Sequence, residues 1–153
     1  MKIVRLCLLL SGMLSVVMST WAAGGLLMVR TQQTFPEAML VLQTSVKDHG
    51  YEVTRVQRID VGLTGKGYKT DKYRVVFVGK PDEIQYLVNK YPVLAAYMPP
   101  QISIFAEGNE TVLVTANPMI YADMIDDEND KILFRRWESD VYSVFDDMRE
   151  AED

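Results

Sequence analysis

The sequence has very little of the two residue types that most often carry chemistry at neutral pH. Its 153 residues include a single cysteine, Cys7, and a single histidine, His49. Cys7 lies in an apolar run near the N-terminus, so removal of that run would leave no thiol in the chain. A disulfide framework, a thiolate nucleophile and a sulfur-rich metal site are then excluded. The spacings Gly-x-Ser-x-Gly and His-Glu-x-x-His, typical of serine hydrolases and zinc peptidases, are also absent.

His49 has a structural explanation. An imidazole titrates near neutrality and can act as a general base or a metal ligand. Here it precedes Gly50 at the end of an expected helix, where a histidine complements the negative end of the helix dipole. We therefore assign no catalytic residue and expect no metal or other cofactor.

Positive charge is scarce in the C-terminal part of the chain. The formal net charge is −5, and residues 123–153 hold twelve acids against four bases. A phosphate backbone is repelled by such a surface, so nucleic acid is not an expected partner. The acidic stretch Asp126–Asp130 lacks the glycine and closing glutamate of an EF-hand loop, which favours a solvated helix start.

The N-terminus has the pattern of an export signal. Lys2 and Arg5 precede an apolar run, and small residues follow up to Ala23. We predict a signal peptide at residues 1–22 and a single domain at 23–153, which makes the protein periplasmic or secreted. The alternative is an uncleaved anchor in the inner membrane formed by residues 6–29, and membrane contact is expected only through this leader.

The clearest pattern in the rest of the chain is a hairpin after Pro99-Pro100. Apolar residues recur at every second position from Ile102 to Ala106, which indicates a strand with one buried face. Glu107-Gly-Asn-Glu110 supplies turn residues, and residues 111–116 alternate again.

Other patterns predict the remaining elements. A capping box at Thr34 starts a helix that ends at Gly50, and the three-residue step from Val53 to Val56 indicates a bulge in the next strand. The expected strands are 26–32, 51–60, 72–78 and the two of the hairpin; the expected helices begin at Thr34, at Pro81 and after Asp130. The last helix carries one apolar stripe, formed by Leu133, Trp137, Val141, Phe145 and Met148, with Phe134 and Val144 at its flanks. The order β-α-β-β-α-β-β-α predicts an α+β fold, a mainly antiparallel sheet with helices packed on one face.

Several short segments fall in the order of a known family. They are Phe35-Pro-Glu-Ala38, Gly50-Tyr51, Gly62-Leu63, Tyr73-Arg-Val-Val76, Tyr97-Met-Pro99, the hairpin from Ile102 to Val114, and Asn117-Pro118. Together they resemble the domain-of-unknown-function 302 family over nearly the whole mature chain. The resemblance implies a small α+β domain that tends to form a homodimer and has no settled activity. Many members carry a cysteine directly after the proline, whereas this chain has Pro100, so thiol chemistry at that position is excluded.

The connection Val61–Asp71 is longer than a tight hairpin requires and rich in glycine, which is typical of a functional loop. We predict a groove between sheet and helices, gated by residues 64–71 and bordered by Tyr97 and the Pro99-Pro100 turn. The candidate ligand-binding residues are Lys66, Tyr68, Lys69, Lys72 and Tyr97, and the candidate loop glycines are Gly62, Gly65 and Gly67.

These observations favour an exported binding or accessory domain, homodimeric, with a small molecule or a protein as partner. The alternative is an enzyme with an unrecognised carboxylate or anion-binding site. A cluster of acids with a base in one pocket would favour that alternative. A third hypothesis is an assembly component that pairs through an exposed strand edge, either 26–32 or 102–106.

Overall fold

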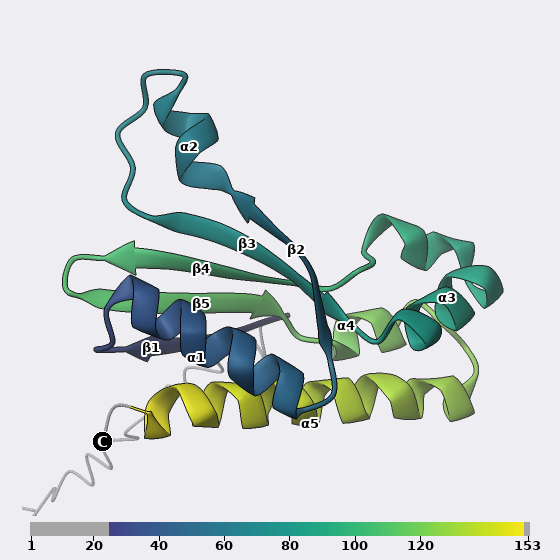
Figure 1. Ribbon diagram of the computed structural model, residues 1–153. Coiled ribbons are helices and arrows are strands. Elements are labelled where there is room, and N and C mark those ends of the chain that lie inside the picture. The colour runs from purple at the N-terminus through teal and green to yellow at the C-terminus, as the bar shows by residue number, and fades with distance from the viewer. Residues whose placement is uncertain (1–24, 152–153) are drawn as a thin grey trace, which may run out of the picture.

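A five-stranded sheet, with the two longest helices on one side, forms the body of the protein (Figure 1). The computed structural model describes residues 25–151, so the predicted signal peptide 1–22 lies outside the described residues. The strands are β1 (Leu26–Thr31), β2 (Glu52–Arg58), β3 (Tyr73–Gly79), β4 (Gln101–Glu107) and β5 (Glu110–Ala116). The helices are α1 (Phe35–Asp48), α2 (Ile59–Thr64), α3 (Pro81–Lys90), the 3-10 helix η1 (Pro92–Ala96), α4 (Met119–Ala122) and α5 (Glu128–Glu150).

The sheet is antiparallel throughout, with the strand order β1-β5-β4-β3-β2. The predicted α+β class and element order are therefore confirmed. The hairpin closes in two residues, where Gly108 takes a φ of 62° that a residue with a side chain rarely adopts. The register of β2 on β3 shifts between Val53 and Arg55, so the predicted bulge is also present.

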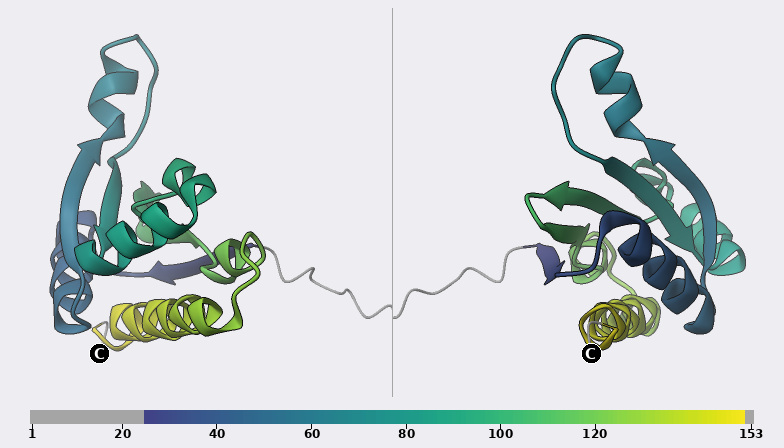
Figure 2. Two further views of the ribbon diagram at one scale, coloured as in Figure 1. Left: turned by 90° about the vertical axis from the view of Figure 1, so that its right-hand side faces the viewer. Right: turned by 60° about the vertical axis from the view of Figure 1, so that its left-hand side comes forward.

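Helices α1 and α5 cover one face of the sheet and bury the main core (Figure 2). The start of α1 is fixed locally, because the Glu37 carboxylate accepts hydrogen bonds from the Thr34 amide at 3.0 Å and the Thr34 hydroxyl at 2.6 Å. Its end is fixed by Gly50, whose φ is +77°. The core between these layers includes Leu42, Val76, Ile104, Leu113 and Phe145.

A second core lies where α3, η1 and α4 meet the N-terminal half of α5. Phe134 is fully buried there, with its ring centroid 5.4 Å from that of Trp137 and 6.0 Å from that of Tyr121. The buried face of α5 is therefore turned away from the centre of the predicted apolar stripe and toward its flanks. Phe134 and Val144 are buried, while Leu133 and Val141 are only half-buried, because α5 packs against α4 as well as the sheet.

An ion-pair cluster ties α3 to the first turn of α5. The Lys90 ammonium lies 2.7 Å from the Asp130 carboxylate and 3.0 Å from that of Asp127. The hydroxyls of Tyr91 and Tyr86 donate to Asp130 at 2.7 Å and 3.0 Å. Asp127 also caps α5 by accepting from the Asn129 amide at 2.9 Å.

The segment from β2 to β3 extends beyond the body of the domain in every view (Figures 1 and 2). Residues 59–60 were expected to end the strand and residues 61–64 to be loop, but residues 59–64 form the short helix α2. Arg74 of β3 makes an ion pair with Asp60 of α2, and the two side chains are only 15% and 16% exposed. This contact holds α2 against the strand that follows it.

Among residues 25–151, none of the helices combines the length and apolar content needed to cross a membrane. Within the stretch considered above as an alternative anchor, residues Leu26 to Val29 belong to β1 and pair with β5.

Candidate functional site

The sheet face opposite α1 and α5 is largely apolar. The register places Met28 of β1 opposite Val114 of β5, and Val114 opposite Ser103 of β4. Because side chains alternate along a strand, these residues point to the same face. That face also carries Leu26, Tyr73, Val75, Phe77, Phe105 and Val112. Leu26 and Met28 are 66% and 55% exposed whereas Val75 and Val112 are buried, so this face is open chiefly along β1.

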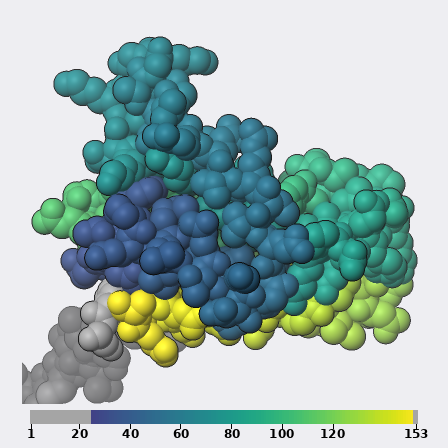
Figure 3. Space-filling view, in the orientation of Figure 1, coloured from purple at the N-terminus to yellow at the C-terminus, as the bar shows by residue number. Residues whose placement is uncertain are grey.

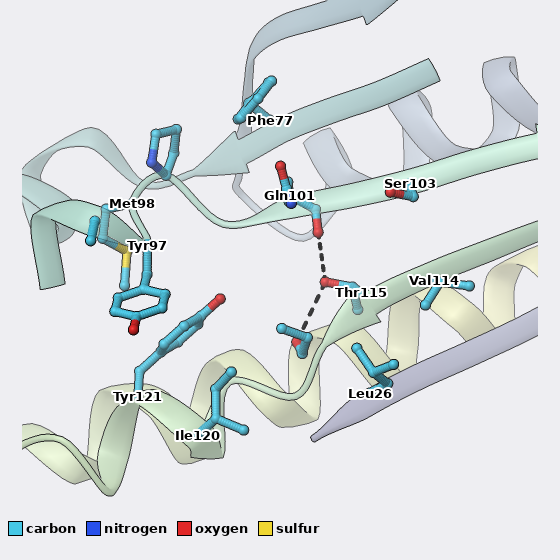
Figure 4. Close-up of a pocket in the computed structure, with 13 residues that line it drawn as sticks. Leu26, Phe77, Tyr97, Met98, Gln101, Ser103, Val114, Thr115, Ile120 and Tyr121 are labelled. Carbon is cyan, nitrogen blue, oxygen red and sulfur yellow. Dashed lines mark hydrogen bonds between the residues drawn. The ribbon is translucent and has the colours of Figure 1, made fainter. Parts of the chain in front are cut away.

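One end of this face is hollowed into a pocket of about 340 Å³, which we call the tyrosine pocket (Figure 4). The strands supply its floor, and η1 with the following turn and α4 supply its wall. Its lining residues are Leu26, Phe77, Ala96, Tyr97, Met98, Pro99, Gln101, Ser103, Val114, Thr115, Ala116, Ile120 and Tyr121. The turn that carries Tyr97 includes a cis peptide bond between Met98 and Pro99.

The Tyr121 hydroxyl is the most informative polar group in the pocket. Tyr121 is 5% exposed, its hydroxyl points into the pocket in Figure 4, and this hydroxyl makes no hydrogen bond within the described residues. Burial, together with the nearby Tyr97, raises the pKa of this phenol, so it stays protonated and keeps a proton to donate. Thr115, by contrast, donates to the Gln101 carbonyl at 2.8 Å.

The pocket is electrically neutral. Its lining includes no Asp, Glu, Lys, Arg or His, and its only ionisable groups are Tyr97 and Tyr121. The two rings are 6.0 Å apart with an interplanar angle of 47°, and they form an aromatic wall above the strands. Such a site selects by shape, aromatic contact and a few hydrogen bonds. Its lining holds no imidazole, carboxylate or amine, the side-chain groups most often used in general acid–base catalysis.

The structure separates the residues predicted to form one site. Tyr97 lines the tyrosine pocket. Lys66, Tyr68, Lys69 and the loop glycines Gly62, Gly65 and Gly67 belong to the projecting segment, and Lys72 lies where that segment returns to the sheet. None of these seven lines the tyrosine pocket, so the projecting segment does not form its gate as we had expected.

Tyr121 and Phe77 were missed as pocket residues. Phe77 lies in the strand predicted at 72–78, and Tyr121 lies after the hairpin, in a stretch for which the sequence patterns predict no element. The β4–β5 hairpin lies between Tyr97 and Tyr121 and brings them together, which no local pattern reveals.

His49 takes part in a contact between α1 and α5. Its Nε2 atom lies 3.1 Å from Oδ2 of Asp147, and the Ser45 hydroxyl donates to the same oxygen. Serine, histidine and aspartate are the residue types of a catalytic triad, but here the serine bonds the carboxylate and not the imidazole. The histidine therefore cannot take the serine proton, and the cluster links two helices.

A second hollow, of about 500 Å³, is lined by acidic residues and a basic residue. Asp71, Lys72 and Glu110 are among its lining residues. The Lys72 ammonium lies over the Phe35 ring, 5.9 Å from its centroid. Within the part of the chain that the structure describes, no group of three or more His, Cys, Asp or Glu residues could hold a metal ion. This hollow is where the enzymatic alternative would have to find its reacting groups.

Fold and pocket together define a small α+β domain with one helix-covered sheet face and a neutral pocket on the other. The family model for DUF302, a domain of unknown function, matches residues 27–147, so the chain belongs to that family. This confirms the resemblance drawn from the sequence. The crystal structure of an uncharacterized conserved DUF302 protein from Bacillus stearothermophilus is similar in fold, with a TM-score of 0.73 and 19% identity. The likeness covers 82% of this chain and 98% of that chain. A search of curated proteins finds no match.

Proposed function

We propose that this protein is an exported, homodimeric binding domain whose tyrosine pocket takes a small uncharged molecule. The observation that carries the proposal is the Tyr121 hydroxyl, which points into the pocket and has no hydrogen-bond partner within residues 25–151. A ligand with a carbonyl or ether oxygen accepts from this hydroxyl, and its apolar part lies against Tyr97 and Phe77.

The neutral lining of the tyrosine pocket favours an uncharged ligand over a charged one. Moving a charged group from water into a site without a countercharge is costly, and no residue of the pocket supplies one. The cluster of acids and a base expected of the enzymatic alternative is absent from this pocket. Binding is therefore the function that its geometry supports best.

Removing the Tyr121 hydroxyl is expected to weaken binding about tenfold, since a well-placed hydrogen bond contributes about 1 kcal/mol or slightly more. The measurement is a thermal-shift screen of the exported protein with uncharged aromatic amides and esters, followed by calorimetry on Tyr121→Phe. Tyr142→Phe is the matched control, because Tyr142 is 49% exposed on α5 and does not line the pocket. Each amide is compared with the corresponding carboxylic acid, whose negative charge should make it bind more weakly. Equal binding of the acids, or unchanged binding by Tyr121→Phe, contradicts the proposal.

The β1 edge of the sheet supports the homodimer. β1 lies at one end of the strand order and, within the described residues, pairs on one side only, with β5. Its sequence Leu-Leu-Met-Val-Arg-Thr has no proline and no lysine, the residues that usually protect such an edge. Two copies that place β1 beside β1 in antiparallel fashion form a continuous sheet related by a two-fold axis.

A lysine on this edge is expected to convert the dimer to a monomer, because two charges then face each other across the two-fold axis. The variant is Met28→Lys, and the measurement is molar mass by light scattering across a tenfold range of protein concentration. Ile132→Lys is the control, since Ile132 is 57% exposed on α5. A wild-type protein that is monomeric throughout the range, or a Met28→Lys variant that remains dimeric, contradicts this arrangement.

Export rests on the leader of residues 1–22. Mass spectrometry of the exported protein is expected to find a chain that begins at Ala23. A mass that includes Met1 would favour the anchored alternative instead.

A further inference from the structure

The segment from Glu52 to Arg74 differs in charge from the rest of the domain, and we call it the cationic arm. It holds six bases and three acids, whereas the rest of the described chain holds eight bases and sixteen acids. A net negative protein therefore carries a positive projection.

The arm also holds most of the cations that have no ion-pair partner. Within residues 25–151, six lysines and arginines lie beyond 4.0 Å of every carboxylate. Five of them are on the arm and are exposed: Arg55, Arg58, Lys66, Lys69 and Lys72. The sixth is Lys47 on α1. Every other lysine and arginine of the described body forms an ion pair with a carboxylate. The positive charge of the arm is therefore available to an external anion.

Apolar side chains accompany these cations. Tyr68 is 63% exposed, Val61 50% and Val56 39%. In the space-filling view the outer end of the arm, formed by α2 and the loop after it, stands clear of the body (Figure 3). Exposed cations around a tyrosine and aliphatic groups are the composition of segments that lie at a membrane interface.

We propose that the outer end of the cationic arm, built around Lys66, Tyr68 and Lys69, binds the surface of a bilayer rich in anionic phospholipid. The lysines contact headgroup phosphates, while Tyr68 and Val61 enter the interfacial layer. The separation between the outer end of the arm and the acidic body is important, because interactions between charges decay over about 8 Å at physiological ionic strength. The arm can thus reach the surface while the acidic body stays outside the range of strong repulsion. This inference does not depend on the tyrosine pocket or on the β1 dimer.

The test measures binding of the exported protein to vesicles by co-sedimentation. One set contains about 30% phosphatidylglycerol in phosphatidylcholine, and the other contains phosphatidylcholine alone. Binding is expected only with the anionic set and is expected to fall steeply with added salt. The double variant Lys66→Gln, Lys69→Gln should bind about 25-fold more weakly, at about fivefold per lysine. Lys47→Gln is the matched control, since Lys47 is an exposed, unpaired cation away from the arm, and it should bind like the wild type.

Tyr68→Ala should weaken binding to the anionic vesicles about fivefold without changing the salt dependence, because it removes interfacial contact and no charge. Any binding through the leader is common to all variants, so differences between variants report the arm alone. Thermal unfolding of each variant should match the wild type, because these side chains are exposed.

Four results would overturn the proposal. The first is equal binding to both vesicle sets, and the second is an unchanged affinity in the double variant. The third is full competition by millimolar inorganic phosphate, which would show that free phosphate is the ligand. The fourth is a change of oligomeric state in the double variant, which would show that the arm binds a second copy of this chain.

Discussion

Replacing Phe134 with alanine is expected to lower the free energy of unfolding by about 3–5 kcal/mol. Phe134 is fully buried, and its ring contacts those of Tyr121 and Trp137. The variant loses the transfer free energy of a phenyl group and leaves a cavity where α4 meets α5. Because small domains are stable by about 5–15 kcal/mol, this single change removes a large share of the total.

The chain offers a built-in probe for this measurement. The sequence has two tryptophans, Trp21 and Trp137, and a protein that begins at Ala23 retains only Trp137. Trp137 is 2% exposed, so its fluorescence should report loss of the second core during urea unfolding. Ile132→Ala is the matched control on the same helix, where the side chain is 57% exposed, and it should change stability by less than about 1 kcal/mol. Equal losses in the two variants would show that Phe134 is not at the centre of a core.

Replacing Asp130 with alanine is expected to cost about 2 kcal/mol at neutral pH, because one carboxylate serves three donors. The Lys90 ammonium and the hydroxyls of Tyr91 and Tyr86 all lie within 3.0 Å of it. Its removal leaves these groups without their common acceptor where α3 meets α5. The cost is below that of a fully buried pair, because the Lys90 side chain is 39% exposed and can turn to water.

The same carboxylate should make stability depend on pH in the acid range. The hydrogen bond from Lys90 is the largest cause that holds the pKa of Asp130 below its ordinary value; burial opposes it, and Tyr91 and Tyr86 add to it. A carboxyl whose pKa is lower in the folded state stabilises that state above its unfolded pKa. That contribution is lost as the pH falls through the folded pKa.

Stability of the wild-type protein should therefore decrease as the pH falls below about 5, and Asp130→Asn should flatten part of that decrease. The measurement is urea unfolding at a series of pH values from neutral to acid. Asp126→Asn is the control, because Asp126 is exposed and makes no ion pair within residues 25–151. If Asp130→Asn and the wild type lose stability in parallel, the cluster does not supply the pH dependence.

Features that depend on neighbouring residues were predicted well from the sequence. The hairpin was readable because Pro99-Pro100, the alternation from Ile102 and the turn at Gly108 all act within a few residues. The same holds for the α1 start at Thr34. Helix α2 was not predicted, because Gly62 in its interior and its short length give a weak helical signal.

Side-chain contacts between residues distant in the sequence were not predicted. The pocket requires η1, β4 and α4 to meet, and the Tyr97 to Tyr121 contact appears only after the hairpin has folded. The rotation of α5 toward Phe134 requires α4 as a packing partner, which the helical period does not reveal. Lys66, Lys69 and Lys72 were predicted from the sequence as candidate ligand-binding residues, but only the ion-pair pattern shows that they lack carboxylate partners within the described residues.

The order of strands also affects when the sheet can be completed. The first strand pairs only with the last one within the described residues, and Leu26 lies opposite Ala116. Long-range pairings of this kind form late, because the chain between the two partners must be closed first. A chain delivered N-terminus first, from a ribosome or through a translocation pore, therefore keeps its leading strand unpaired until β5 has emerged. The order of the strands thus delays completion of the sheet at its leading edge.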